Sequence, residues 1–296
     1  MSYEVDILFI GHFAVDKLVY KGKEEISSGG SVYYGAIAAR RLGLRVAVVT
    51  RLHPDDFPRL EELKAEGILV YAHPAPQSSG IENVYYTEDM ERRMCRPLGF
   101  AGPFSPDELP DLKVRIYLIG PIMAGEVDMP FLEAVAERGP VALDVQGFVR
   151  VREGDGLVFR DWPEKRRGLP LVRFLKADAA EAEVLTGFKD VRRAARQLAE
   201  WGASEVVLTH SGGVLVYAEG SYYEAPFKPR SMKGRTGRGD TCFATYVAKR
   251  FSSPPQEATR FAAALTSLKL EKPGPFRGTP GDVEELLKAW EQERIV

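Results

Sequence analysis

Gly234-Arg235-Thr236-Gly237-Arg238-Gly239-Asp240-Thr241-Cys242-Phe243-Ala244 begins as a glycine-rich turn and ends as a helix. Gly237 and Gly239 allow backbone conformations that a Cβ would hinder, and Asp240 and Thr241 stand where helix N-caps are favoured. A glycine turn that opens onto a helix N-terminus binds anions through free N–H groups and the helix dipole. A carboxylate there would repel a phosphate, unless Asp240 is the base that deprotonates the nucleophile attacking that phosphate. Such a stretch in isolation is more often only a capped helix after a loop, so the rest of the chain must decide.

Composition and charge limit the kinds of protein that this chain can be. The 296 residues are 45% hydrophobic, which predicts one large α/β domain over residues 1–296, or one domain with a small appendage. The formal net charge of -2 argues against a nucleic-acid partner, and no polybasic run indicates a membrane surface. Cys95 and Cys242 form no CxxC pattern, so no zinc site or disulfide framework is indicated. The N-terminus lacks the pattern of a signal peptide and the apolar runs are too short to span a bilayer, which predicts a cytoplasmic protein.

Strand-like and helix-like segments alternate along most of the chain. Val5 to Ile10 is the first apolar strand, and helices are expected at 31–42, 56–66, 129–138, 179–186 and 255–270. This order predicts a mostly parallel central sheet with helices on both faces, a three-layer α/β/α sandwich. Ligands of such sheets bind at the carboxyl ends of the strands. The residues to inspect just past the expected strands are Asp16, Asp144, Asp178, Glu181, Thr209 and Gly212.

Two pairs of β segments interrupt this order in the N-terminal third. Residues at about 17–28 form one pair with a turn at Lys21-Gly22, and residues at about 79–97 form another with a turn at Glu88-Asp89. We expect the two insertions to meet as one small β-sheet lid over a cleft. The alternatives are a pair of surface hairpins or a dimer contact, and a lid can also serve as such a contact.

Several motifs of other enzyme classes are missing. The chain has no GxxxxGK[ST], which excludes a P-loop NTPase, and no GxGxxG after the first strand, which argues against a dinucleotide site. It also lacks HExxH and the GxSxG elbow.

Over essentially its whole length the chain resembles the ribokinase-like carbohydrate kinases of the PfkB family. Thr236 to Thr241 looks like the family's T-G-A-G-D signature, and Gly29-Gly30 with the following small-residue helix looks like its N-terminal signature. Segment 176–187 is similar to the N-x-x-E segment, and segment 207–213 resembles the nucleotide-binding T-x-G-x-x-G. Within the family, residues 81–83, 144–151 and 159–162 and the arginine at 238 are most similar to myo-inositol kinases.

The resemblance implies a role for each matched residue. Asp240 would deprotonate the substrate hydroxyl, and the N–H groups of Gly237, Arg238 and Gly239 would form the anion hole with that of Asp240. Glu181 would organise Mg²⁺ through water. The other implied contacts are Asp16, Gly29, Gly30, Asn83 and Gln146 for the substrate, and Asp178, Thr209, Gly212, Thr236, Ala263 and Gly274 for ATP.

Three positions depart from the family pattern. Arg238 replaces the usual alanine, and its side chain either contacts phosphate or points to solvent. Asp178 replaces the usual asparagine and puts a second carboxylate near Glu181. Tyr34 stands where ribokinases have a sugar-binding asparagine, which argues against ribose in its usual pose.

These observations predict an ATP- and Mg²⁺-dependent kinase for a hydroxyl of a small polyol or sugar, with myo-inositol as the first candidate. The alternatives are a kinase for another sugar, a sugar acid or a nucleoside, and a regulator that binds nucleotide or sugar without catalysis. We expect a monomer or a homodimer formed through the lid, with no nucleic-acid or membrane partner.

Overall fold

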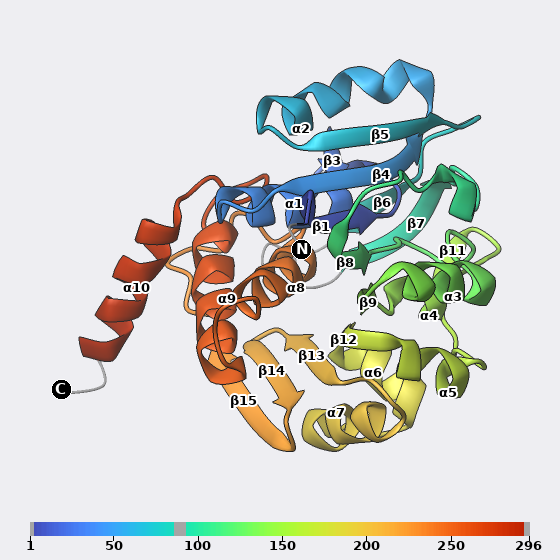
Figure 1. Ribbon diagram of the computed structural model, residues 1–296. Helices are drawn as coiled ribbons and strands as arrows, with labels where there is room; N and C mark the ends of the chain where they lie inside the picture. The colour runs from blue at the N-terminus through green and yellow to red at the C-terminus, as the bar shows by residue number, and fades with distance from the viewer. Residues whose placement is uncertain (1–2, 86–92, 293–296) are drawn as a thin grey trace.

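The centre of the fold is a large, mostly parallel β-sheet. The computed structural model describes residues 3–85 and 93–292, and Figure 1 shows the sheet between two layers of helices. Within these residues nine strands pair in the order β15-β14-β13-β12-β9-β8-β1-β4-β5, parallel from β13 to β5 and antiparallel at β13-β14-β15. The strands are β1 (Val5–Ile10), β4 (Val46–Leu52), β5 (Leu69–Pro74), β8 (Val114–Ile119), β9 (Val141–Asp144), β12 (Val172–Asp178), β13 (Glu205–His210), β14 (Gly213–Ala218) and β15 (Ser221–Pro226).

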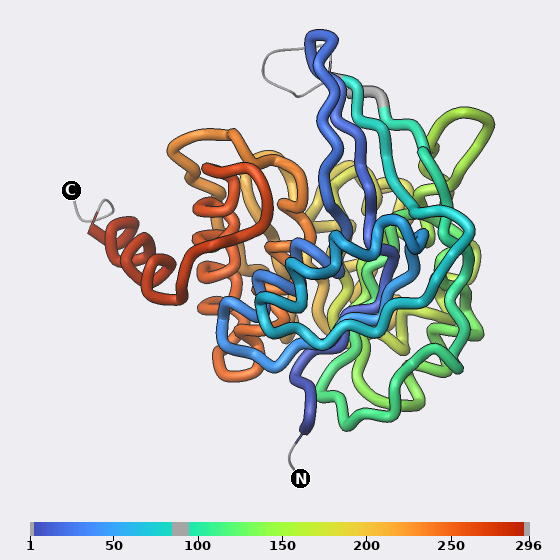
Figure 2. The backbone as a smooth tube through the Cα atoms, turned by 90° about the horizontal axis from the view of Figure 1, so that it is seen from above, coloured from blue at the N-terminus to red at the C-terminus, as the bar shows by residue number. Residues whose placement is uncertain are grey.

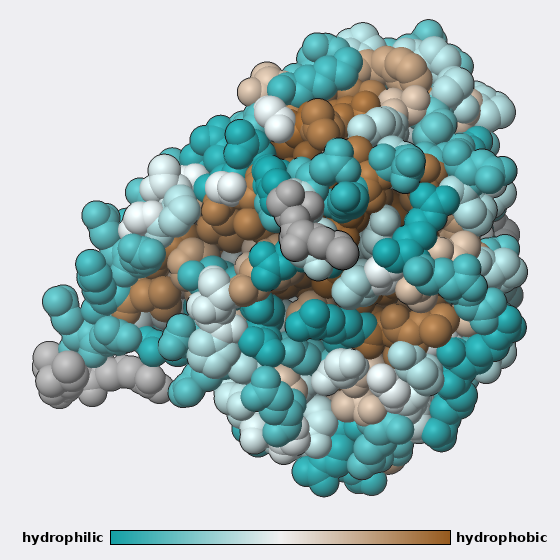
Figure 3. Space-filling model, in the orientation of Figure 1, coloured by the Kyte–Doolittle hydropathy of each residue, from teal (hydrophilic) through white to brown (hydrophobic). Residues whose placement is uncertain are grey.

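Helices cover both faces of the sheet, which is why its parallel strands are apolar nearly throughout. Alternate residues of β1 enter opposite cores: Ile7 and Phe9 join the core under α1, α8 and α9, whereas Leu8 and Ile10 join the core under α3, α6 and α7. The α-helices are α1 (Ser31–Arg41), α2 (Glu61–Ala65), α3 (Met129–Arg138), α4 (Gln146–Val149), α5 (Lys165–Gly168), α6 (Ala179–Thr186), α7 (Val191–Glu200), α8 (Arg238–Lys249), α9 (Pro255–Leu270) and α10 (Pro280–Gln292). Short 3-10 turns are η1 (Pro54–Leu60), η2 (Pro106–Glu108) and η3 (Leu169–Leu171). On the face drawn in Figure 3 the surface is mostly hydrophilic, with hydrophobic residues in small groups.

The predicted lid is present as a second sheet. Its strands β2 (Ala14–Tyr20), β3 (Lys23–Gly29), β6 (Gly80–Tyr85) and β7 (Arg93–Gly99) pair in the order β3-β2-β6-β7. Figure 2 shows these strands projecting together from the body of the molecule. The two insertions meet through a parallel pairing of β2 with β6, which places Leu18 opposite Asn83. The predicted turn at Glu88-Asp89 lies outside the described residues.

Two stretches differ from what the sequence predicts. Residues 146–168 hold α4, a hairpin of β10 (Arg150–Glu153) with β11 (Gly156–Phe159), and α5. α4, β10, β11 and α5 are each four residues long, too short for a hydrophobic period to reveal them. The helix expected at 56–66 is a 3-10 turn followed by the short α2. The helices expected at 129–138, 179–186 and 255–270 have those bounds. Within the described residues no helix combines the length and apolar character needed to cross a bilayer.

Candidate active site

The candidate active site is a cavity of about 370 Å³ between the lid and the carboxyl ends of the central strands. That location follows the rule for open α/β sheets. Its lining comes from the lid (Ala14, Asp16, Ile81, Asn83, Cys95), from the start of α1 and its surroundings (Gly30, Ser31, Tyr34), from the loop after β8 (Gly120, Pro121, Ile122), from strand ends and α4 (Asp144, Gln146, Arg150, Lys176, Asp178, Thr209) and from Arg235 to Asp240.

Gly237 is the residue at which the glycine turn becomes α8. Its φ of 76° lies in the left-handed region, and a Cβ there would stand 2.1 Å from Cγ of Tyr34, so only glycine fits. Because Gly237 is the N-cap, the prediction that Asp240 and Thr241 cap this helix is wrong: α8 begins at Arg238 and both residues lie in its first turn. Side-chain caps are more common than glycine caps, which explains the error.

The first turn of α8 leaves its leading N–H groups for a ligand. Thr241 N donates to Gly237 O at 3.0 Å and is the first to bond within the helix, while Arg238 N donates to Arg235 O at 3.3 Å in the preceding turn. The N–H group of Gly239 and that of Asp240, which also hydrogen-bonds to the carboxylate of its own side chain, lie between them at the positive end of the helix dipole. This end of α8 can therefore stabilise an anion in the cavity.

Asp240 is partly exposed to the cavity. Burial by the surrounding protein raises the pKa of its carboxyl, opposed by Lys176, by the backbone N–H of Asp240 itself, and by Lys269 and Arg150. A carboxylate with a raised pKa holds a proton more firmly once it has accepted one. Asp240 can therefore act as a general base towards a hydroxyl group in the cavity.

Lys176 is a nearly buried cation beside the glycine turn, in the lining of the cavity. Its Nζ lies 3.0 Å from Asp144 Oδ2 and 3.5 Å from Glu181 Oε2, and a Cβ on Gly239 would stand 3.5 Å from the same nitrogen. Burial would lower the pKa of Lys176, but the surrounding carboxylates, Asp144 first, outweigh burial and hold that pKa above its ordinary value. Lys176 therefore stays charged under the anion-binding end of α8.

Asp178 and Glu181 form the capping box of α6. Asp178 Oδ1 accepts from Glu181 N at 2.8 Å, and Glu181 Oε2 accepts from Asp178 N at 2.7 Å. Glu181 is fully buried, and among the described residues its Oε1 has no hydrogen-bond partner. No group of three or more His, Cys, Asp or Glu in residues 3–85 and 93–292 could hold a metal ion. Mg²⁺ often binds through only one or two carboxylates together with substrate phosphates and waters, so Asp178 in the lining with Glu181 behind it fits an ion shared with a phosphate donor.

The lid supplies the opposite wall. Asp16 Oδ1 accepts from Ile81 N at 2.8 Å, which ties β2 to β6, and a Cβ on Gly29 would stand 2.5 Å from Asp16 Oδ2. Asn83 and Cys95 are cross-strand partners, with Cys95 Sγ 3.3 Å from Asn83 Oδ1. Amide, thiol and carboxylate groups in this wall match the hydroxyl groups of a small polar acceptor.

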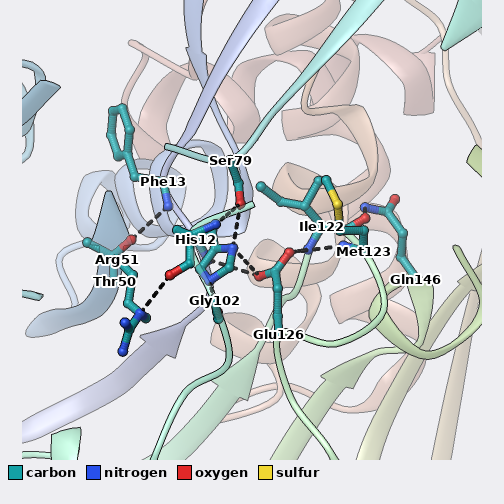
Figure 4. Close-up of polar contacts among 11 residues, drawn as sticks. His12, Phe13, Thr50, Arg51, Ser79, Gly102, Ile122, Met123, Glu126 and Gln146 are labelled. Carbon is teal, nitrogen blue, oxygen red and sulfur yellow. Dashed lines mark hydrogen bonds and ion pairs between the residues drawn. The ribbon is translucent and has the colours of Figure 1, made fainter. Parts of the chain in front are cut away.

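Glu126 supports the loop after β8, which contributes Ile122 to the cavity lining (Figure 4). Its Oε1 accepts from the N–H groups of Ile122 at 2.7 Å and Met123 at 3.0 Å, and its Oε2 accepts from His12 N at 3.1 Å. Gln146 Nε2 in turn donates to Ile122 O at 3.1 Å. Burial raises the pKa of Glu126 to about 7, opposed by these N–H groups and by Arg150. The buried carboxylate thus holds the cavity-lining loop at Ile122 against the end of β1.

His12 completes this network as a neutral side chain. Burial lowers the pKa of His12 to about 3. Its Nε2 lies 2.8 Å from Gly102 O, an acceptor, so Nε2 carries the hydrogen and Nδ1 accepts from Ser79 Oγ at 2.7 Å. Since the ring is uncharged, its 3.4 Å approach to Glu126 is not an ion pair. His12 is therefore a buried link between β1 and the base of the lid.

Eleven of the predicted site residues line the cavity: Asp16, Gly30, Asn83, Gln146, Asp178, Thr209, Thr236, Gly237, Arg238, Gly239 and Asp240. Five do not: Gly29, Glu181, Gly212, Ala263 and Gly274. The expectation that Ala263 flanks adenine conflicts with its position, because its side chain is fully buried in the core that includes α8. Gly212 lies in the exposed turn after β13, where its N–H donates to His210.

Two lysines that were not predicted as site residues also lie at or next to the site. Lys176 is part of the lining, and Lys269 is buried close to the turn that precedes α8. Lys176 is a lone lysine in the apolar segment Phe174 to Ala177, and Lys269 stands between Leu268 and Leu270 near the end of the expected helix 255–270. A charge expected inside a core needs a partner, and that signal was available in the sequence.

Comparison with known proteins agrees with this geometry. The family model described as pfkB family carbohydrate kinase matches residues 11–280. A solved pyrophosphate-dependent kinase in the ribokinase family, complexed with a pyrophosphate analog and myo-inositol, is 36% identical with a TM-score of 0.87, covering 94% of this chain and 99% of that chain. The structure of a pyrophosphate-dependent myo-inositol-1 kinase converted into a myo-inositol-3 kinase is 35% identical, also with a TM-score of 0.87, covering 96% and 99%.

A cytidine kinase of Thermococcus kodakarensis is 28% identical over 258 residues, which are 82% of this chain and 88% of that protein. The extent of the family match and the agreement in fold lead to one assignment. The chain belongs to the pfkB family of carbohydrate kinases and is a sugar or polyol kinase with the ribokinase-like fold.

Proposed function

We propose that this kinase phosphorylates a hydroxyl of myo-inositol, with Asp240 as the general base. One observation carries the proposal: a single cavity is lined by the lid residues Asp16 and Asn83 and by Asp240 at the start of α8. A polyol held by the lid would present a hydroxyl to Asp240, and the N–H groups beside Asp240 would stabilise charge that develops on the transferred phosphoryl group. The inositol-bound kinase of similar structure supports this acceptor.

The donor that we propose is pyrophosphate rather than ATP. Four cationic side chains line the cavity: Arg150, Lys176, Arg235 and Arg238. None of Gly212, Ala263 and Gly274, which ATP would have been expected to contact, lines it. The same lining holds four aspartates, Asp16, Asp144, Asp178 and Asp240, and Lys176 is paired with Asp144. Arginine side chains beside a helix N-terminus suit a small, highly charged donor, and the similar kinases use pyrophosphate. ATP, the donor expected from the sequence, is the alternative.

Each step of the proposed phosphoryl transfer would depend on residues of this chain. The cationic side chains bind and orient the donor, the lid excludes water, and Asp240 accepts the hydroxyl proton. Mg²⁺, when bound beside Asp178, would neutralise charge on the donor phosphates. Most of the acceleration would come from positioning and electrostatics.

Lid residues would choose which hydroxyl reacts. Asn83 and Cys95 face each other across β6 and β7 in the cavity wall. In the similar myo-inositol-1 kinase, replacing an asparagine and a serine with leucine converts the enzyme to a 3-kinase, so small polar side chains can set the orientation of that substrate. We infer that Asn83 and Cys95 orient the acceptor here.

A donor-by-acceptor matrix tests the proposal. Purified protein with Mg²⁺ is assayed with pyrophosphate or ATP against myo-inositol, ribose, a sugar acid and cytidine, with ³¹P NMR to detect the phosphorylated product. We expect turnover with pyrophosphate and myo-inositol. A preference for ATP would overturn the donor, and a preference for cytidine would overturn the acceptor.

We also infer that the kinase works in the cytoplasm, as a monomer or as a homodimer formed through the lid. Ile26 and Leu98, two hydrophobic side chains of lid strands, are 50% and 48% exposed, which supports a lid contact. Light scattering after size-exclusion chromatography distinguishes the two states, and Ile26→Lys should dissociate a lid-mediated dimer.

A further inference from the structure

Lys269 is a buried cation that the proposed mechanism does not use. It lies near the end of α9 with 2% of its surface exposed. Its Nζ donates to the backbone carbonyl oxygens of Gly234 and Thr236, and it lies 4.9 Å from the centre of the Tyr34 ring. Both carbonyl groups belong to the turn that leads into Gly237. Lys269 therefore contacts the glycine turn without being part of the cavity lining.

The turn depends on α9 for its position. Gly234 N donates to Leu270 O at 2.8 Å, and a Cβ on Gly234 would stand 1.7 Å from Lys272 O, so the turn is pressed against the end of α9. The ring of Tyr34, which Lys269 faces, is the same ring that excludes a Cβ from Gly237. Lys269 thus contacts the turn at Gly234 and Thr236 and also the Tyr34 ring that packs against Gly237, just before the N–H groups that would bind the anion.

The surroundings of Lys269 favour its protonated form when a phosphate is bound in the cavity. Burial lowers the pKa of Lys269 to about 7. The Asp240 carboxylate acts to raise this pKa, and the Arg238 guanidinium acts to lower it further. The groups that face the ammonium are thus Asp240 and Arg238 from α8 and Tyr34 from α1. A phosphate anion at the end of α8 would favour the protonated form further.

We propose that Lys269 is a positioning residue and the internal counter-cation of the anion hole. Its ammonium orients the Gly234 and Thr236 carbonyl groups so that the N–H groups at the start of α8 face the donor phosphate. Two converging carbonyl oxygens are also ligands for a small monovalent cation. Because Lys269 already occupies them, this kinase has no need for such an ion from solution. The inference rests on the proposed phosphoryl transfer.

Two substitutions separate this role from simple packing. Lys269→Met keeps the length of the side chain and removes its charge, whereas Lys269→Ala also leaves space beside the two carbonyl groups. Lys272→Ala, which removes an exposed lysine three residues along the chain, is the control. Thermal melts with circular dichroism establish that each variant is folded before kinetics are measured.

We expect kcat to fall about tenfold or more in both Lys269 variants, while KM for the polyol changes little, because loss of an anion-hole contact acts on the transition state. Ammonium, methylammonium or potassium ions should restore part of the activity of Lys269→Ala and none of that of Lys269→Met, since methionine fills the space. The wild type should turn over equally in sodium, potassium and ammonium salts at one ionic strength.

Some outcomes would overturn the inference. One is a Lys269→Met variant with nearly normal kcat; another is a wild type activated several-fold by potassium or ammonium ions, a measurement that needs no variant. If the wild type phosphorylates no acceptor, the proposed function fails by itself. The binding of methylenediphosphonate, measured by calorimetry, then still tests the role of Lys269. Its affinity should fall in Lys269→Met and stay at the wild-type value in Lys272→Ala. Equal affinity of Lys269→Met and the wild type would contradict the inference.

Discussion

Glu126→Gln should change how the stability of the protein depends on pH. The folded pKa of Glu126 is about 7, above its ordinary value of 4.5, because the side chain is buried. Between these values the folded protein keeps a proton that the unfolded chain has released, so the free energy of unfolding falls as pH rises through this window. A shift of this size corresponds to about 3 kcal/mol in total, of which about 2 to 3 kcal/mol is lost between about pH 5 and about pH 8.

The glutamine variant cannot ionise, so this loss disappears. Its carbonyl oxygen can still accept from Ile122 and Met123, but its NH₂ group then faces the N–H of His12, which costs about 1 to 2 kcal/mol. The variant should therefore be less stable than the wild type near pH 5 and equal or more stable near pH 8. The two stability curves should cross near neutral pH.

Urea unfolding monitored by circular dichroism over this pH range measures the effect. The difference between wild type and variant isolates Glu126, because Glu181, whose pKa burial also raises to about 7, is present in both proteins. Glu137→Gln, at an exposed position on α3, is the matched control. A wild-type minus Glu126→Gln difference that stays constant with pH would refute the argument that burial outweighs the three N–H donors.

Three further predictions concern catalysis. Asp240→Asn should lower kcat about 100- to 10,000-fold with donor binding nearly intact, and wild-type activity should fall as pH drops through the raised pKa of Asp240; near-normal kcat in the variant would exclude this base. Gly237→Ala should destabilise the protein by about 1 to 3 kcal/mol and lower kcat at least tenfold, since its φ is left-handed and Tyr34 occupies the space. Gly187→Ala, at a similar φ with open space around it, should cost less and leave kcat unchanged. Asn83→Ala should raise KM for the polyol more than KM for the donor, and equal increases would remove Asn83 from the acceptor site.

Much of the architecture could be predicted because it is encoded by neighbouring residues. Buried parallel strands such as β1 are continuous apolar runs, and α3, α6 and α9 carry a helical period over whole turns, so their bounds agree with expectation. The short elements of residues 146–168 carry no such period. The start of α8 was misplaced by three residues because glycine rather than a side chain caps it.

The turn from Gly234 to Thr241 and the Asp240 carboxylate within it were evident in the sequence alone, because a glycine turn before a helix is a local pattern. The supports of that turn were decided only by the tertiary structure. Lys176, beside Gly239, meets Asp144 across 32 positions, and Lys269 meets Gly234 across 35. The loop at Ile122 on the other side of the cavity depends likewise on Glu126, which meets His12 across 114 positions. A buried charge needs a partner wherever the fold can supply one, and no local period records how far along the chain that partner lies.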